Sequence, residues 1–124
     1  MRPRSRTLTA QELEIMKIVW SLKTATVRDV YEDLLKRRKI AYTTVMTMMK
    51  ILEDKHYLKK RAVERAYVYE AAQPKARVIK TMVQEFVSRV FNGSAEPLLV
   101  QLVKDRKLSE KELRQILRTI QESS

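Results

Sequence analysis

Apolar residues recur three or four positions apart through most of the chain, which is the spacing of amphipathic helices. Three such segments follow one another in its first half. Their inward-facing residues are Leu13, Met16, Val19 and Trp20 in the first segment, Val27, Val30, Tyr31, Leu34 and Leu35 in the second, and Val45, Met48, Met49 and Leu52 in the third. The pattern predicts three consecutive helices, the last of which ends near Lys55.

Local signals mark where these helices begin and end. Thr9 and Glu12 have the spacing of a capping box, and Thr26 can cap the second helix with Asp29 at its third position. A residue with positive φ is usually needed just past a helix end, and histidine tolerates that conformation better than most residues other than glycine. We therefore expect His56 to fill this position after the third helix rather than to bind a metal.

Two strand-like runs follow at residues 57–62 and 66–70, and residues 63–65 turn between them. Tyr67 and Tyr69 share one face of the second run because side chains alternate along a strand. Three helices followed by a hairpin with a basic first strand are the element order of a winged helix-turn-helix domain. The expected fold class is therefore mainly α with a small β-hairpin.

The charge of the chain points to its partner. Hydrophobic residues make up 44% and charged residues 33% of the sequence, as in a folded helical protein. The net charge of +11 lies well above the magnitude of about 2–8 suited to ordinary small domains. Such a charge favours a polyanion, either nucleic acid or an anionic membrane surface.

The outer face of the third helix is uncharged or cationic, since acidic residues begin only at residues 53–54. A face of this kind suits the major groove of DNA, although many threonine-rich helix faces are simply solvated. The candidate recognition residues are Tyr42, Thr43, Thr44, Met46, Thr47 and Lys50. Met46 and the threonine methyl groups offer apolar contact to thymine, and Lys50 is expected on the backbone.

Basic residues around this helix are candidates for phosphate contacts, which supply affinity but little sequence information. They are Lys59, Lys60, Arg61 and Arg65 in the hairpin, and Arg4 and Arg6 in an N-terminal arm. The arm either tracks phosphates or enters the minor groove. A solubilising terminus explains it equally well.

From residue 74 onward the pattern is helical again. Asn92-Gly93 stops a fourth helix, Pro97 fits the first turn of a fifth, and Ser109 with Glu112 caps a sixth. These helices carry more apolar surface than they can bury among themselves. We expect a second copy to cover it, and packing back onto the first half is the alternative. The expected dimerisation residues are Val83, Phe86, Val90, Phe91, Leu98, Leu102, Leu113, Ile116, Leu117 and Ile120.

The chain is thus expected to divide into a winged-helix DNA-binding domain with its basic arm at residues 1–73, and a helical dimerisation domain at residues 74–124. A two-fold dimer would place two recognition helices on a palindromic operator. A non-specific architectural protein or an RNA-binding protein remains the alternative, because phosphate contacts distinguish the polymers weakly.

An enzyme is not expected, because the acidic residues are scattered or lie at cap positions and the chain has a single histidine. The absence of cysteine excludes disulfides and thiolate metal sites. With no apolar run suited to a membrane span or a signal peptide, we expect a cytoplasmic protein without a cofactor. A neutral hairpin would have favoured a winged helix used only for protein contacts. The predicted hairpin is basic instead.

Three segments carry a further signal. They read L-T-A-Q-E-L-E-I-M-K-I-V-W at residues 8–20, A-Y-T-T-V-M-T-M-M-K-I-L-E-D-K-H-Y-L at residues 41–58 and Y-V-Y at residues 67–69. In these segments the chain resembles the penicillinase-repressor and methicillin-resistance-repressor family, and the resemblance covers almost all of residues 7–122. It implies a bacterial homodimeric repressor of double-stranded operator DNA. It also implies an upstream membrane sensor metalloprotease, whose signal leads to repressor cleavage and release from DNA.

The chain departs from this family at three places. Tyr42 stands where staphylococcal members have proline, and Met46 stands where they have an arginine that can bind guanine through two hydrogen bonds. Their operator sequence therefore cannot be carried over. Their cleaved Asn-Phe bond corresponds to Gln101-Leu102. The copper-responsive branch has C-terminal cysteine pairs, and this chain has none.

Overall fold

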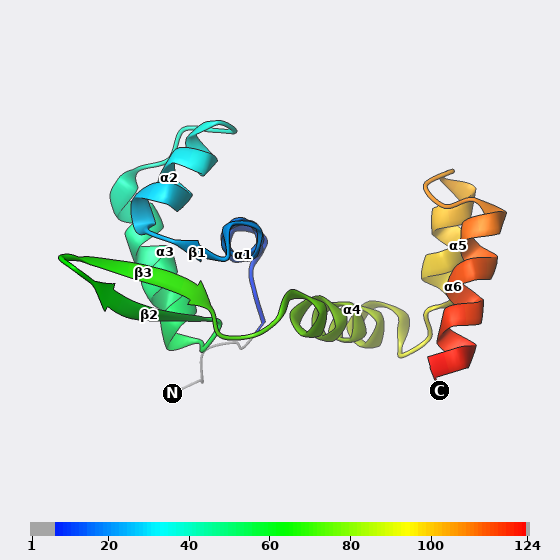
Figure 1. Ribbon diagram of the computed structural model, residues 1–124. Helices are drawn as coiled ribbons and strands as arrows, with labels where there is room; N and C mark the ends of the chain where they lie inside the picture. The colour runs from blue at the N-terminus through cyan, green and yellow to red at the C-terminus, as the bar shows by residue number, and fades with distance from the viewer. Residues whose placement is uncertain (1–6, 124) are drawn as a thin grey trace. The chain divides into compact units, whose positions relative to one another are not determined.

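The computed structural model describes the backbone of residues 7–123 and the side chains of residues 7–116 and 118. The helices are α1 (Ala10–Leu22), α2 (Val27–Leu35), α3 (Tyr42–Asp54), α4 (Lys75–Phe91), α5 (Glu96–Lys104) and α6 (Glu110–Ser123), and the strands are β1 (Thr24–Ala25), β2 (Leu58–Val63) and β3 (Ala66–Ala71) (Figure 1). The expected class, mainly α with a winged helix, is confirmed.

The cap signals in the sequence are confirmed. The Thr9 hydroxyl accepts a hydrogen bond from the backbone N–H of Glu12 at 3.1 Å, and the Glu12 carboxylate accepts one from the N–H of Thr9 at 2.8 Å. Thr26 and Asp29 make the same reciprocal pair at the start of α2. His56 has a φ of 67° just past α3, as expected from its position.

The hairpin belongs to a sheet of three antiparallel strands in the order β1-β3-β2. Strand β1 pairs with β3 through Thr24 opposite Glu70 and Ala25 opposite Tyr69. The sequence did not predict β1, because two residues cannot show an alternating pattern. The turn is also shorter than expected: Val63 pairs with Ala66, and the intervening Glu64 has a φ of 56°. The hairpin of β2 and β3, which we call the wing, is therefore joined to the rest of the domain by the pairing of β3 with β1.

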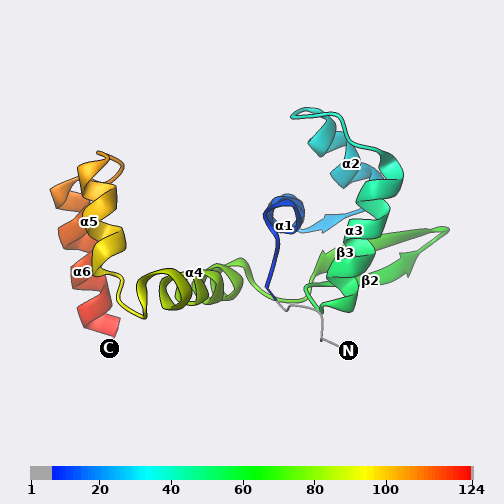
Figure 2. The ribbon, with the colours of Figure 1, turned by 180° about the vertical axis from the view of Figure 1, so that it is seen from behind.

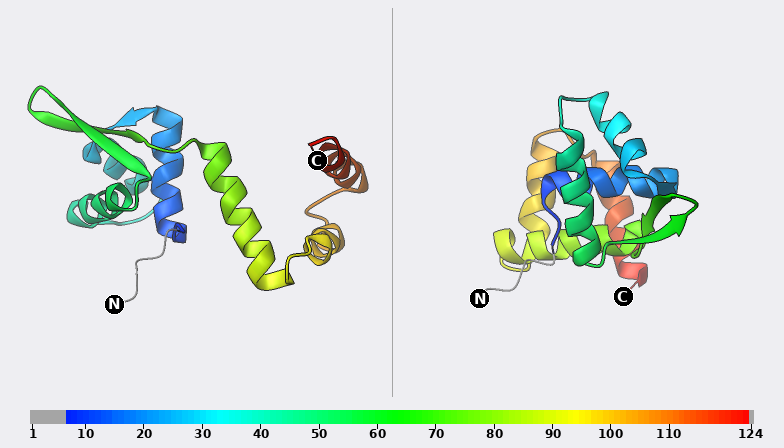
Figure 3. Two further views of the ribbon diagram at one scale, coloured as in Figure 1. Left: turned by 90° about the horizontal axis from the view of Figure 1, so that it is seen from below. Right: turned by 90° about the vertical axis from the view of Figure 1, so that its left-hand side faces the viewer.

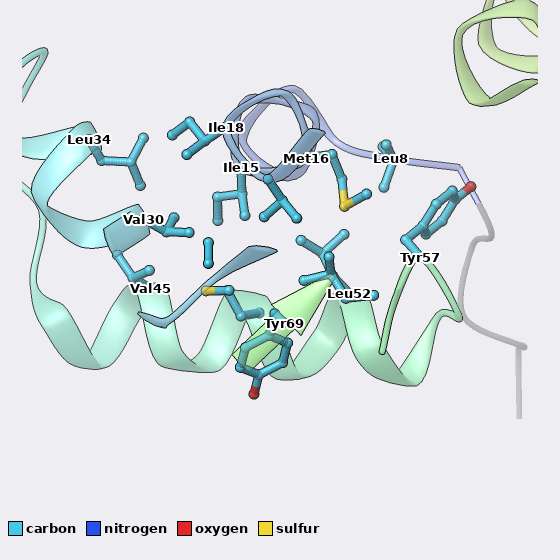
Figure 4. Packing of buried hydrophobic residues seen from close by; sticks show 14 of the residues in the cluster. Leu8, Ile15, Met16, Ile18, Val30, Leu34, Val45, Leu52, Tyr57 and Tyr69 are labelled. Carbon is cyan, nitrogen blue, oxygen red and sulfur yellow. The ribbon is translucent and has the colours of Figure 1, made fainter. Parts of the chain in front are cut away.

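The core lies where α1, α2 and α3 converge on β3 (Figure 4). Its fully buried large side chains are Ile15, Met16 and Val19 from α1, Val30 and Leu34 from α2, and Val45, Met49 and Leu52 from α3. Burying each of these side chains favours folding by about 1.5–3 kcal/mol. Because three residues of α3 are fixed inward, the opposite side of that helix must face outward.

The chain forms two compact units, the first ending at Met82 and the second beginning at Val83. The first unit thus runs past the boundary expected at residue 73 and includes the start of α4. The physical reason is that Val78 is buried in the core of this unit and Met82 packs against it. Trp20 holds the segment just before α4 against α1, since its indole N–H donates a hydrogen bond to the carbonyl oxygen of Gln73 at 3.0 Å.

The second unit contains the end of α4 and the antiparallel helices α5 and α6 (Figures 1 and 2). Asn92 and Gly93 end α4 with φ values of 55° and 87°, and Pro97 lies in the first turn of α5, both as expected. None of the side chains described in this unit is buried. In the described part of the chain, no helix combines the length and apolar character needed to cross a bilayer.

Candidate nucleic-acid interface

The outer face of α3 carries all six candidate recognition residues. Val45, Met49 and Leu52 hold the opposite face in the core and have no exposed surface. The exposed residues are Tyr42, Thr43, Thr44, Met46, Thr47 and Lys50. The structure therefore presents to solvent the side chains that the sequence singled out.

These six residues fall into two parts of the helix surface. Tyr42, Met46 and Lys50 follow one another at intervals of four residues and line a groove between α3 and the wing. Thr43, Thr44 and Thr47 are absent from this groove. We call it the wing groove; it has a volume of about 630 Å³ and is lined by Thr26, Val27, Arg28, Tyr42, Met46, Lys50, Lys60, Ala66, Tyr67 and Tyr69.

The N-terminal end of α3 is suited to an anion. Ala41, at the cap position, makes no side-chain hydrogen bond to the helix, and the first turn contains no acidic residue. The positive end of the helix dipole is therefore uncompensated by its own side chains. Tyr42 is held at this end by an edge-to-face contact with Tyr31, with ring centroids 5.3 Å apart.

The wing projects from the end of α3, past the helices of its unit (Figures 2 and 3). Its candidate cations are in two different situations. The Lys60 ammonium lies 3.6 Å from the Glu53 carboxylate and 4.6 Å from the centre of the Tyr67 ring, and Lys59 lies 3.7 Å from Glu70. Arg61 and Arg65 are exposed and have no ion pair among the described residues.

Two arginines that follow α2, Arg37 and Arg38, form ion pairs with carboxylates. The Arg38 guanidinium lies 2.7 Å from the Glu14 carboxylate, and Arg37 lies within 4 Å of both Glu14 and Asp33. The two pairs with Glu14 join this segment to α1. Arg37 and Arg38 therefore have a structural role.

One buried ion pair was not predicted from the sequence. The Lys55 ammonium donates to the Glu12 carboxylate at 2.8 Å and to the carbonyl oxygen of Thr7 at 3.1 Å. The two side chains are 8% and 7% exposed. This pair ties the start of the described chain to the end of α3. Arg4 and Arg6, the candidate arm residues, lie outside the described residues.

The charge state of this pair follows from its contacts. Burial by itself raises the pKa of the Glu12 carboxyl. Hydrogen bonds from the Lys55 ammonium and from Thr9, together with the Lys55 charge, outweigh burial and hold that pKa below its ordinary value. Glu12 is therefore an ionised partner that fixes the end of α3.

The sequence and fold of the chain are similar to those of known regulators. The penicillinase repressor of Bacillus licheniformis is 24% identical over 111 residues, which cover 90% of this chain and 87% of the relative. The methicillin resistance regulatory protein MecI of Mammaliicoccus sciuri is 20% identical over 109 residues, covering 88% of this chain and 89% of that protein.

Two solved structures are similar to the fold. One is the monomeric form of Bacillus licheniformis BlaI in complex with the blaP half-operator; it has a TM-score of 0.50 and 26% identity over 60% of this chain and 87% of that chain. The other is oxidised MarR from E. coli, with a TM-score of 0.53 and 13% identity over 94% of this chain and 75% of that chain, a likeness of fold alone. The model of the family described as penicillinase repressor matches residues 8–122. The chain therefore belongs to the penicillinase repressor family of DNA-binding transcriptional repressors.

Proposed function

We propose that this protein represses transcription in the cytoplasm by binding a palindromic operator as a homodimer. The observation that carries the proposal is the outward face of α3, which combines threonines, Met46 and Lys50 with an uncompensated helix N-terminus. The net charge of +11 supports a polyanionic partner. The similar BlaI structure contains a half-operator, which supports DNA as that partner.

In this proposal α3 recognises bases through apolar contacts and through threonine hydroxyl groups. Thr43, Thr44 and Thr47 would enter the major groove, where their methyl groups contact thymine methyls and their hydroxyls bind base edges. Met46 would add apolar contact on the side of the wing. Lys50, one helical turn further along, would bind the DNA backbone beside the major groove. Tyr42 would contact the backbone at the helix N-terminus.

The second unit supports a dimer. The side chains of Val83, Phe86 and Val90 are 50%, 41% and 51% exposed and recur along one side of α4. Phe91, Leu98, Leu102 and Leu113 are only partly buried, and Ile116 is exposed. Covering these residues with a second copy would remove apolar area from water. The remaining expected contacts, the side chains of Leu117 and Ile120, lie outside the described residues.

The proposed release step is a cut between Gln101 and Leu102 in α5, initiated by a membrane sensor metalloprotease. Gln101 is exposed, and its side-chain amide donates a hydrogen bond to Asp105, which follows the end of α5. None of the residues of α5 is buried within its own chain, so the helix can unwind locally at small cost in a protomer that has separated from its partner. The accessibility of α5 in the separated protomer supports cleavage there.

Fluorescence anisotropy with a duplex from upstream of its own gene tests the function. We expect binding about a thousandfold tighter than to unrelated DNA, with two protomers per site. Equal affinity for all duplexes, or tighter binding to RNA of the same sequence, would instead support an architectural or RNA-binding protein.

Two wing variants should separate phosphate contact from wing positioning. Arg61→Ala removes an unpaired cation, so we expect weaker binding to every duplex and a salt slope reduced by about one. Lys60→Ala removes a cation already paired with Glu53 and stacked on Tyr67, so its salt slope should change less. Lys80→Ala on α4 is the control for net charge. A change of base preference in Arg61→Ala would contradict its assignment to the backbone.

A further inference from the structure

We propose that the wing groove binds a small planar aromatic carboxylate, and that the bound acid displaces DNA. The first half of this inference concerns the groove alone. The second half rests on the proposed function, because it requires α3 and the wing to hold DNA.

The lining of the groove favours an aromatic guest. Tyr42, Met46 and Tyr67 come from two separate elements, yet their side chains are 40%, 47% and 57% exposed around one hollow. Large apolar side chains gathered in this way gain free energy when a planar ring covers them. The volume of about 630 Å³ lies within the range of about 300–1,000 Å³ found for small-molecule sites. One or two fused rings fit such a space.

The charges of the groove favour an anion. Arg28, Lys50 and Lys60 line it, and none of the described lining residues is acidic. Lys50 has no ion pair among the described residues. In the described part of the chain Arg28 forms an ion pair with Glu32 alone, and both side chains are more than half exposed, so that pair is weak and easily exchanged. Lys60 is already paired with Glu53, so a carboxylate at the rim would bind Lys50 or Arg28 while the ring lies on the tyrosines.

Binding of such an acid would oppose DNA binding for a steric reason. Tyr42, Met46 and Lys50 belong both to the groove and to the outer face of α3. A DNA backbone passing between α3 and the wing would need the same space and the same cations. At an acid concentration ten times its Kd, competition should raise the apparent Kd for DNA about tenfold.

Calorimetry of the full chain without DNA tests the site itself, with 2-naphthoate as the probe. We expect one molecule per protomer with a Kd below about 1 mM. The neutral 2-naphthalenemethanol and the non-planar cyclohexanecarboxylate should each bind at least about fivefold more weakly, because one lacks the charge and the other the flat ring. Equal binding of the neutral compound, or no saturable heat from 2-naphthoate, would overturn the proposal.

Two variants locate the site. Tyr67→Ala should weaken 2-naphthoate about tenfold by removing the exposed ring of the wing, and circular dichroism checks that the variant folds. Val100→Ala, at an exposed position of α5 outside the expected dimer contacts, should leave the Kd unchanged. If Val100→Ala weakens binding and Tyr67→Ala does not, the acid binds to the second unit and the wing groove is not its site.

Anisotropy with DNA then tests displacement. We expect 2-naphthoate to raise the apparent Kd for DNA in proportion to its occupancy measured by calorimetry, while cyclohexanecarboxylate at equal ionic strength does not. If the acid binds and the DNA affinity is unchanged, the displacement half is wrong. If no duplex binds even without acid, the proposed function fails, and the calorimetric result for the groove still stands.

Discussion

Replacing Phe86 with glutamate should convert the protein to a monomer and lower its affinity for a full operator about a hundredfold, to the level of a half-site. Phe86 is 41% exposed and touches Phe91 edge-to-face, with ring centroids 5.8 Å apart. In the proposed dimer a carboxylate at this position would be buried without a partner, which is costly. Analytical ultracentrifugation gives the oligomeric state, and anisotropy on full and half operators gives the affinity.

Gln84→Glu supplies a matched control for this variant. Gln84 is exposed on the same helix, two positions away and therefore on the other side of α4. It introduces the same charge and should leave both the dimer and the operator affinity intact. If Phe86→Glu sediments as a dimer, or if both variants lose operator binding equally, the apolar side of α4 is not the dimer interface.

Replacing Lys55 with methionine should lower the free energy of unfolding by about 3–5 kcal/mol, because it leaves the Glu12 carboxylate buried without its cation. Lys59→Met is the control, since the Lys59 side chain is 63% exposed and a surface pair such as that with Glu70 contributes about 1 kcal/mol or less. Urea unfolding measures both. Adding Glu12→Gln to Lys55→Met should recover part of the loss. Equal effects of Lys55→Met and Lys59→Met would show that the buried pair adds no special stability.

The same pair predicts the response to acid. The pKa of Glu12 is held below its ordinary value in the folded protein, so ionised Glu12 favours folding. This contribution is fully present above the unfolded pKa of about 4.3 and is lost as the pH falls through the lower folded pKa. We expect the stability difference between wild type and Glu12→Gln to shrink in this window. A difference that is constant with pH would contradict the assigned charge state.

The features that the sequence predicted are those with local signals. The capping residues Thr9 and Thr26, the positive φ of His56 and the end of α4 at Asn92 each depend on neighbours within a few positions. The inward side of α3 follows from its period, although Met48 proved only partly buried. Signals from neighbouring residues were therefore enough to predict the order of the elements and the residues that α3 exposes to solvent.

The missed features depend on residues far apart in the chain. Glu12 and Lys55 are separated by 43 positions, and neither carries a local sign that it will be buried. Strand β1 exists because β3 offers it a partner edge. The pairing of Lys60 with Glu53 likewise depends on how the wing meets α3. The sequence could therefore list the cations of the wing but not separate the engaged ones from the free ones.

The position of α4 determines which part of the repressor would stay folded after a cut between Gln101 and Leu102. The buried side chains described in the chain all precede Val83, and α4 runs from Lys75 to Phe91 without interruption. A chain severed after Gln101 would keep the whole first core and remain a folded DNA-binding head, but it would lose the part of the proposed dimer interface that follows the cut. Derepression would then be a matter of valency. If protomers are cut independently, the share of intact pairs falls as the square of the intact fraction, so modest proteolysis would produce a disproportionate response.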